Sequence, residues 1–519
     1  MQVRIFARRL VILGLFLGGG CIMEMNETRP ADVQLIRQYS ETAGYTHGRP
    51  TGIRATEDGT AVLFLRSGPR DNLRKLFEMD VASGDVRELI RAEEILGDAD
   101  EKLSAEEKAR RERMREGGRG IASFDLSADG RHILITLGGG LHVIRRSDRR
   151  ITSLPKRDEG PAIDSKFSPN GKYVTCVRGH DLYAIDWEAG EEWAVTTGGS
   201  AAVTHALAEF VAAEEMGRHT GYWWSGDSKL LAFAEADLRE VEVLRIADSF
   251  HPEKAPQPWR YPRAGTANAK VRLGIVSVRG GKVTWVDWDR ERFPYLATVK
   301  WGRSGPLTIL VQARDQQEQV LYRVDPTNGQ LTELLRETDQ AWLNIHRDMP
   351  RWFSEGSRFI WLSESRGSNS LELRDRDGEL QRTLTFSGVG TGEHARIDGV
   401  VAVNEEHGGI MVRHGDRPTE VALSAVKIDT GAEMPWSSRV DPRPGKSSNA
   451  VWSGTASKNW MTWVLTKSDQ TGARTSWVVS KLSEDGVVHE LPSIAVQPPY
   501  VPTLELTTVE GDGRVFQTA

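Results

Sequence analysis

The sequence predicts an all-β protein, an eight-bladed β-propeller of four-stranded blades with short helical insertions. A short sequence unit recurs along the chain. It begins with an aromatic or apolar residue, continues with a short turn that contains Gly or Asp, and ends in a strand with an alternating pattern. Clear copies are ATEDGTAVLFLR from Ala55, LSADGRHILIT from Leu126, FSPNGKYVTCV from Phe167 and WSGDSKLLAFA from Trp224. Hairpin signatures such as LYAIDWEAGEE and LYRVDPTNGQL follow many copies, with Asp and Gly at the turn. Short strands that repeat roughly every 40–50 residues are typical of propeller blades.

Four further copies of the unit are weaker. They read WGRSGPLTILV from Trp301, FSEGSRFIWL from Phe353, WSGTASKNWMTWVL from Trp452 and a degraded NEEHGGIMVR from Asn404. Successive unit starts lie 71, 41, 57, 77, 52, 51 and 48 residues apart, so the longer intervals carry insertions. Eight units predict eight blades over residues 51–498, after a lead-in segment of residues 22–50. A count of seven stays open because the units at Trp301 and Asn404 are weak.

Three insertions interrupt the repeat. Residues 93–115 are dense in charge and helix formers, and predict a short exposed helix on a blade loop. A solvated surface is the simpler interpretation of this helix, and a partner-binding surface is the alternative. Residues 207–220 precede the fourth unit, and the Pro-rich residues 249–269 are expected to run over the surface.

Composition excludes some classes of protein. With 39% hydrophobic and 27% charged residues, the chain is ordinary for a globular protein. The net charge of −6 argues against a nucleic-acid binder, which would show a basic stripe. Only Cys21 and Cys176 are present, so no intrachain disulfide is expected in the mature protein. Cys176, inside the strand YVTCV, is interpreted as a small buried residue and not a nucleophile. We expect no metal and no cofactor.

The first 21 residues predict export. Arginines precede an apolar run and a glycine run in RIFARRLVILGLFLGGGC, from Arg4 to Cys21. This order describes a secretory signal that is too short to span a bilayer as a mature helix. Cys21 after small residues is a lipidation candidate, although Gly18 stands where lipoprotein signals usually carry leucine. The expected location is the periplasm or the cell envelope; an uncleaved membrane anchor is the alternative.

The block LAEFVAAEEMGRHTGYWWSGDSKLLAFAE, from Leu207 to Glu235, carries the candidate binding site. Glu214 and Glu215 are adjacent carboxylates, and at about 5 Å in an effective dielectric near 20 their repulsion costs roughly 3 kcal/mol. A cation drawn between them relieves that cost, so the pair is a candidate ammonium trap. A solvated helix face is the alternative interpretation.

Neighbouring residues are expected to support the pair. Arg218, at helical spacing from Glu214, is predicted to pair with it and to hold its rotamer. The alternative is an ordinary surface ion pair worth under about 1 kcal/mol. Tyr222 and Trp223 open the next strand, where one aromatic ring could line a pocket, and Trp224 is expected to pack in the core.

This block, with YPRAGTANAKVRLGIV from Tyr261 to Val276, resembles the N-terminal β-propeller region of the dipeptidyl peptidase IV family. Its bacterial members typically show E-E-M-x-R-x-T-G-Y-W-W-S. The resemblance implies a propeller of eight blades, and it implies that Glu214 and Glu215 bind the free N-terminal amine of a peptide. The chain departs from the family at Ala236–Val241, where ADLREV replaces a D-E-S-x-V phrase.

In that family an α/β-hydrolase domain follows the propeller and carries a G-x-S-x-G serine elbow, which this chain lacks. Residues 499–519 are expected to be the truncated start of the linker to that domain. We therefore expect no catalytic residues here and no peptide cleavage by this chain alone. His205, His219 and His346 are interpreted as hydrogen-bonded structural residues.

Three functions stay open. In the first, the chain is the substrate-gating propeller of a serine dipeptidyl peptidase whose α/β-hydrolase domain is separately encoded or lost. In the second, it is a non-enzymatic envelope propeller that binds peptide N-termini or a protein partner. In the third interpretation it is a scaffold with an unused glutamate pair. Contact with a membrane is expected only through a lipid on Cys21.

Overall fold

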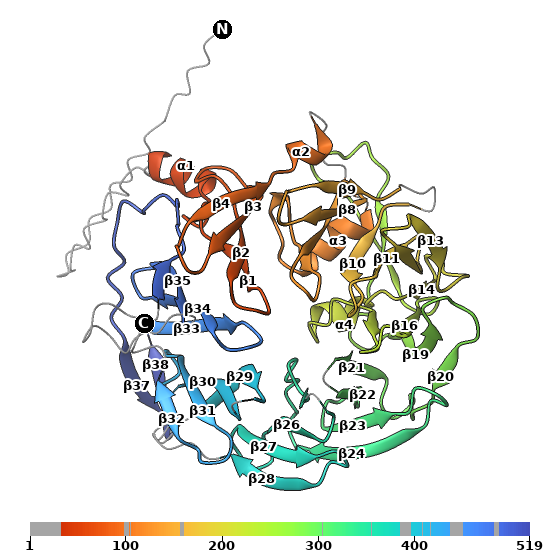
Figure 1. Cartoon of the computed structure of the whole chain (residues 1–519). Coiled ribbons are helices and arrows are strands. Elements are labelled where there is room, and N and C mark those ends of the chain that lie inside the picture. Colours follow the sequence, from red (N-terminus) through yellow and green to blue (C-terminus); the bar gives the residue numbers. More distant parts are fainter. Residues whose placement is uncertain are drawn as a thin grey trace, which may run out of the picture.

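The computed structural model describes residues 33–97, 103, 105–155, 160–303, 305–353, 355–384, 396–406, 408–415, 417–435, 450–481 and 487–518. Within these residues, eight small antiparallel sheets follow one another around a ring (Figure 1). The prediction of an eight-bladed propeller is therefore confirmed, and the alternative of seven blades is wrong. The export segment, with Cys21, lies outside the described residues.

Each sheet is made from strands that follow one another in the chain, except that a separate two-stranded hairpin interrupts the fourth sheet. The first two sheets contain β1 (Thr51–Ala55), β2 (Ala61–Arg66), β3 (Leu73–Asp80), β4 (Val86–Ile90) and β5 (Arg119–Gly120), then β6 (Asp125–Leu126), β7 (His132–Leu137), β8 (Gly140–Arg145) and β9 (Ile151–Ser153). The third and fourth contain β10 (Ile163–Phe167), β11 (Tyr173–Arg178), β12 (Asp181–Asp186) and β13 (Glu191–Ala194), then β14 (Val203–His205), β15 (Tyr222–Trp224), β16 (Leu230–Asp237), β19 (Lys270–Ser277) and β20 (Thr284–Val286).

The second half of the ring repeats the same plan. The fifth and sixth sheets contain β21 (Tyr295–Gly302), β22 (Gly305–Gln312), β23 (Glu318–Val324) and β24 (Leu331–Thr338), then β25 (Arg351–Trp352), β26 (Arg358–Ser363), β27 (Ser370–Asp375) and β28 (Leu380–Leu384). The last two contain β29 (Arg396–Asn404), β30 (Gly409–Gly415), β31 (Ala422–Lys427) and β32 (Glu433–Pro435), then β33 (Ala450–Ala456), β34 (Thr462–Asp469), β35 (Arg474–Ser480) and β36 (Val487–Glu490).

The recurring sequence unit is a hydrogen-bonded turn between the first two strands of a blade. In the third blade, Ser168 Oγ donates to Asn170 Oδ1 at 2.7 Å and accepts from the Tyr173 backbone N–H at 2.9 Å. The same pair of bonds forms around Thr56, Ser127, Ser225 and Ser457. Because one hydroxyl satisfies both the turn and the start of the next strand, the unit specifies a tight hairpin wherever it occurs.

The ring closes by side-chain packing, since the first and last sheets share no strand. Val62 and Phe64 of β2 pack in one buried cluster with Val464 of β34 and Val478 of β35. At the turn tips, Thr462 Oγ1 donates to the Gly59 carbonyl at 2.6 Å. Elsewhere, too, the apolar core lies between neighbouring sheets.

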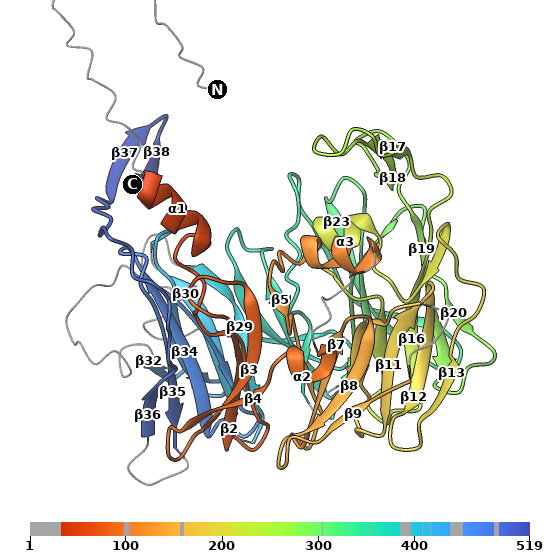
Figure 2. The same cartoon turned by 90° about the horizontal axis from the view of Figure 1, so that it is seen from above.

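Insertions gather on one rim of the ring. Figure 2 shows α1 (Val33–Glu41), α3 (Ala105–Arg113), the hairpin β17 (Val243–Ile246)–β18 (Gln257–Arg260) and the hairpin β37 (Thr507–Gly511)–β38 (Arg514–Thr518) above the same edge of the blades. The yellow-green helix α4 (Phe210–Glu214) lies beside α3. The short helix α2 (Glu93–Leu96) lies lower, against the first two blades.

The expectation that residues 93–115 form a simply exposed helix is wrong. The described part of this segment forms α2 and α3, and on α3 Glu107 and Arg111 are buried. Arg110 and Arg111 both donate to the Glu107 carboxylate, so burial of these charges is offset within the helix.

Cys176 is fully buried, as predicted, and burial raises the pKa of its thiol to about 12.

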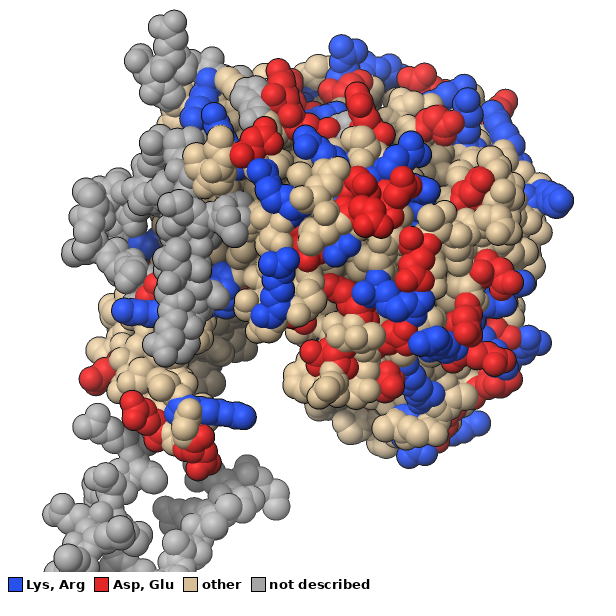
Figure 3. Space-filling model, turned by 90° about the horizontal axis from the view of Figure 1, so that it is seen from below, with Lys and Arg blue, Asp and Glu red and all other residues tan. Residues whose placement is uncertain are grey.

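Seen from below, acidic and basic side chains are interspersed over the described surface, with no large basic patch on that face (Figure 3). Across the described ranges, no helix combines the length and apolar character needed to cross a bilayer.

The closing interface predicts a large loss of stability on Phe64→Ala. Phe64 is fully buried and stacks on Phe77 with ring centroids 5.5 Å apart. Removing a ring from such a site costs about 3–5 kcal/mol of unfolding free energy. Urea unfolding followed by tryptophan fluorescence measures it. Phe250→Ala, at a residue 88% exposed on the β17–β18 hairpin loop, is the control and should change little; equal effects of the two variants would contradict this account of closure.

Candidate functional site

Glu214 and Glu215 lie at the C-terminal end of the short helix α4. Glu209 precedes α4, and its carboxylate accepts hydrogen bonds from the Val211 and Ala212 backbone N–H groups, each at 2.7 Å. Burial raises the pKa of the Glu209 carboxyl. Ala212 and Ala213 face the core. Glu214 is the last helical residue, so both carboxylates lie where free carbonyl groups already make the potential negative.

Only one member of the pair has a cation beside it. Arg113 Nε of α3 lies 3.7 Å from Glu214 Oε1, too far for a hydrogen bond. Glu215 is exposed and forms no ion pair with any residue that the structure describes. Within the described residues, only Glu214 therefore has a guanidinium within ion-pair distance, and the charge of Glu215 is left without a partner of this kind.

Arg218 does not support Glu214 in the way that its spacing predicts. The helix ends before Arg218, because the chain turns at Gly217 with φ of +61°. A Cβ at Gly217 would lie 1.9 Å from Arg347 Cζ, but that flexible side chain can move, so the positive φ is the reason that this position favours glycine. Arg218 is buried and donates from Nε to the Leu296 carbonyl and from Nη1 to the Thr220 carbonyl, each at 3.1 Å.

Arg218 therefore ties the turn after α4 to the fifth blade. Burial lowers the pKa of its guanidinium, and the nearby charge of Glu209 opposes that shift. The predicted partner of Glu214 is replaced by Arg113, which sequence reasoning missed. The sequence does show an arginine-dense run, EKARRERMR. It does not show that this run lies close to the acidic pair, because that closeness depends on how the blades are arranged in the ring.

The aromatic residues after the pair mostly pack inside the blade. Tyr222 is fully buried, its hydroxyl donates to the Asp164 carbonyl, and Lys166 Nζ lies 3.7 Å from its ring centroid. Trp224 is buried, as expected, and donates from Nε1 to Thr175 Oγ1 at 3.1 Å. Trp223 is partly buried with the Arg218 guanidinium over its ring. None of these three lines the cavity described next.

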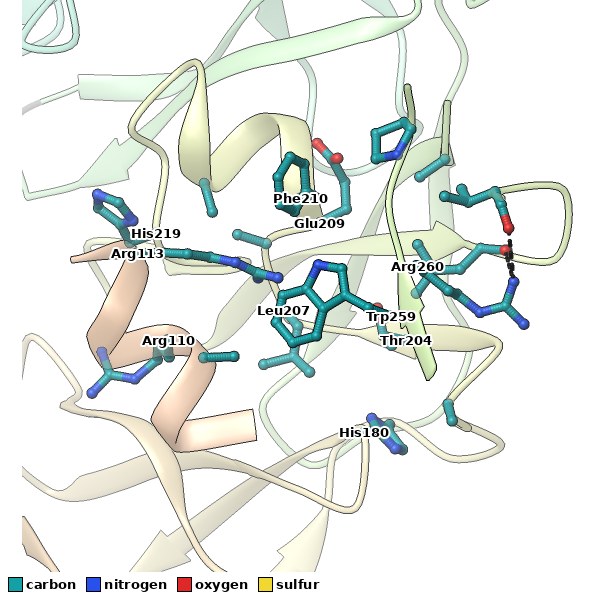
Figure 4. A pocket seen from close by; sticks show the side chains of 18 of the residues that line it. Arg110, Arg113, His180, Thr204, Leu207, Glu209, Phe210, His219, Trp259 and Arg260 are labelled. Carbon is teal, nitrogen blue, oxygen red and sulfur yellow. Dashed lines mark hydrogen bonds between the residues drawn. The ribbon is translucent and has the colours of Figure 1, made fainter. Parts of the chain in front are cut away.

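A cavity of about 330 Å³ adjoins the pair (Figure 4). Its walls come from α3, from α4 and the segment before it, and from the β17–β18 hairpin. They include the aromatic rings of Phe210 and Trp259, with Arg113 between them. Neither Glu214 nor Glu215 is among the lining residues; the cavity reaches α4 at Phe210 and Ala213, and it includes Arg113, the residue beside Glu214.

The three histidines singled out from the sequence have different settings. His205 is buried between Asp181, 2.7 Å from Nδ1, and Glu235, 3.1 Å from Nε2, so the predicted hydrogen bonding of this histidine is confirmed. Burial and the charges of Arg347 and Arg110 lower the pKa of His219, which lines the cavity. The hydrogen bonds expected at His219 Nδ1 and His346 Nε2 are not formed with other described residues.

Comparison with known proteins identifies the family. Residues 127–472, more than half of the chain, match the family model "Dipeptidyl peptidase IV (DPP IV) N-terminal region". The chain belongs to this family. The matched residues run from the second blade to the eighth and include α4 and the glutamate pair.

Named relatives are similar over only part of their length. Dipeptidyl peptidase 8 of Mus musculus is 24% identical over 323 residues, which cover 50% of this chain and 36% of the relative. Inactive dipeptidyl peptidase 10 of Mus musculus is 25% identical over 186 residues, 34% of this chain and 23% of the relative. The chain thus spans about a third or less of the length of these two relatives.

A solved structure agrees with the fold. The crystal structure of Porphyromonas gingivalis dipeptidyl peptidase 4 superposes with a TM-score of 0.67 at 19% identity. The match covers 88% of this chain and 61% of that chain. At this identity the likeness supports the propeller architecture alone.

The His205 contacts predict a pH-dependent junction between the third and fourth blades. Burial alone would lower the pKa of His205, but hydrogen bonds and charges of Asp181 and Glu235 outweigh it and hold the pKa above its ordinary value. The stabilisation is therefore fully present below the unfolded-state pKa of about 6.5, and is lost as the pH rises through the higher folded-state pKa.

Thermal unfolding of the wild type and of His205→Gln at several pH values measures this effect. The melting temperature of the wild type should exceed that of the variant most at low pH, and the difference should shrink as the solution becomes alkaline. His251→Gln, at an exposed histidine, is the control. A difference that grows with pH would show that His205 is neutral in the folded protein.

Proposed function

We propose that this protein binds the free N-terminal amine of a peptide through Glu214 and Glu215. The observation that carries the proposal is the charge imbalance at the end of α4: two neighbouring carboxylates, with one guanidinium at 3.7 Å from Glu214. An α-ammonium group placed between them supplies the missing positive charge and up to three N–H donors. Charge-assisted hydrogen bonds of this kind contribute about 1.5–3 kcal/mol each.

The two glutamates contribute differently to this binding. Glu214 is partly buried and held near Arg113, so its position is set before the ligand arrives. Glu215 is exposed and free to turn towards the ammonium group. The fixed acceptor adds little ordering cost on binding, and the adjustable acceptor gives up rotamer freedom to let the site close on its ligand.

We further propose that the propeller serves a serine dipeptidyl peptidase as its substrate-binding part. Its family membership and relatives named dipeptidyl peptidases support this proposal. By fixing the amine, the pair would set how far a peptide reaches towards a catalytic serine, so that cleavage falls after the second residue.

An α/β-hydrolase domain, separately encoded or otherwise supplied, is the partner that this function requires. Exposed apolar side chains on the rim that carries α3 and α4 support docking there, since such surfaces mark interaction sites. On α1 they are Val33, Ile36 and Tyr39, and on β37–β38 they are Val509, Val515 and Phe516. Export to the periplasm or cell envelope, with Cys21 as the lipidated residue, is part of the same proposal.

Binding of matched peptides tests amine capture. A peptide with a free N-terminus should bind more tightly than its N-acetylated copy. Glu214→Gln and Glu215→Gln should each weaken the free-amine peptide by about tenfold or more, the equivalent of one charge-assisted bond. Glu188→Gln, at an exposed glutamate in the turn after β12, is the matched control. Equal affinity for the two peptides in the wild type would refute the proposal.

A cleavage assay separates the peptidase function from binding without catalysis. The purified chain alone should give no turnover of a dipeptide p-nitroanilide, because its sequence holds no G-x-S-x-G elbow. Turnover that appears only when an α/β-hydrolase domain is added supports the gating role. Turnover by the chain alone would overturn the expectation that it has no nucleophile of its own.

A further inference from the structure

Helix α3 has almost no apolar surface with which to hold its place. Its sequence, AEEKARRER, contains two alanines and no larger apolar residue. Burial of apolar area, which fixes most helices of globular proteins, therefore contributes little here. Arg110 and Arg111 bind Glu107 of the same helix, and these bonds satisfy charges without joining α3 to α4.

Arg113, in the last turn of α3, makes the contacts that reach α4 and the hairpin. Its guanidinium carbon lies 5.3 Å from the centroid of the Phe210 ring and 5.5 Å from that of the Trp259 ring. Figure 4 shows the side chain extending from α3 towards both rings across the cavity. We call this arrangement of Arg113, Phe210 and Trp259 the Arg113 sandwich.

The rings matter more to Arg113 than its ion pair does. Burial lowers the pKa of the guanidinium, and Arg113 Nε is buried without a hydrogen bond among the described residues. The 3.7 Å contact with Glu214 is too long for a hydrogen bond, so it attracts the guanidinium without fixing its orientation. Cation–π contacts strengthen as the cation is desolvated, and here two rings act on one cation.

Trp259 comes from a hairpin that is far from the glutamates in sequence but anchored close to them. It lies on β18, paired with Leu244 of β17. The neighbouring Arg260 donates to the Leu238 carbonyl at 2.6 Å, which fixes the base of the hairpin to its blade. Phe210 also packs edge-on against Tyr261, with centroids 4.7 Å apart. Three separate insertions thus meet at one guanidinium.

We propose that the β17–β18 hairpin positions the amine site, with Trp259 as a positioning residue that acts through Arg113. By holding the Arg113 guanidinium against Phe210, Trp259 fixes the charge beside Glu214 and leaves Glu215 to complete the site. This inference rests on the proposed function, and it adds the hairpin as the element through which amine binding is controlled.

Hydrogen exchange of α3 tests the sandwich without any ligand. Trp259→Ala should raise the exchange rate of residues 105–113, and Trp259→Phe, which keeps a ring, should stay near the wild type. Phe250→Ala, in the exposed loop of the same hairpin, is the matched control and should leave α3 unchanged. Exchange in Trp259→Ala equal to the wild type would overturn the proposal. If Trp259→Ala fails to fold, Arg113→Gln removes the cation and leaves the hairpin intact, with the same expected rise.

Peptide binding tests the positioning role. Trp259→Ala should weaken a free-amine peptide by about tenfold, the equivalent of a desolvated cation–π contact. It should leave the N-acetylated peptide unchanged, and Trp259→Phe should restore most of the affinity. In a Glu214→Gln background the further loss should disappear. An equal loss in that background would show a general disturbance and refute the positioning role.

The two proposals fail in different ways. If the wild type binds free-amine and acetylated peptides equally, the proposal of amine capture is refuted, and the positioning role is refuted with it. Hydrogen exchange at α3 then still decides whether the Arg113 sandwich holds the helix. A wild type that prefers the free amine, together with full binding by Trp259→Ala, keeps amine capture and refutes the hairpin's role.

Discussion

The site depends on a ring whose two ends are joined by side-chain packing and by no shared strand. Phe64 and Val62 of the first blade meet Val464 and Val478 of the last in one buried cluster. This packing fixes the relative positions of blades that contribute separate insertions to one rim. The ring brings α3, α4 and the β17–β18 hairpin close together, and the contacts of Arg113 with Phe210 and Trp259 then join them.

Charge is the second constraint, and it sets what the rim can bind. Glu214 and Glu215 follow the carbonyl end of α4, and only Glu214 has a cation beside it. Bringing a second cation there lowers the free energy, whereas an anion would be repelled. The buried Arg218 does not compensate the pair, since its guanidinium donates to backbone carbonyls of Leu296 and Thr220. This charge arrangement is the support for the proposed binding of an ammonium group, which a peptide N-terminus supplies.

The sequence predicted those features that local chemistry decides. The turn unit around Ser168 carries its own hydrogen bonds, so counting its copies predicted eight blades. The position of Glu214 and Glu215 together at the end of α4 follows from their adjacency in the chain. The role of Arg218 was predicted wrongly because one turning residue, Gly217, ends the helical spacing. The contacts of Arg113 with Glu214 and of Trp259 with Arg113 were not predicted, because they depend on how the blades are arranged in the ring. No repeat or spacing in the sequence indicates that arrangement.

The pH dependence of amine binding tests the central claim most directly. The affinity advantage of a free-amine peptide over its acetylated copy should be measured from about pH 6.5 to about pH 9.5, across the α-amino pKa of about 7.7–8.0. If the glutamates bind an ammonium group, the advantage is largest at the acidic end and disappears as the amine loses its proton. An advantage that stays constant across this range would contradict the account, because the site would then recognise something other than the charge.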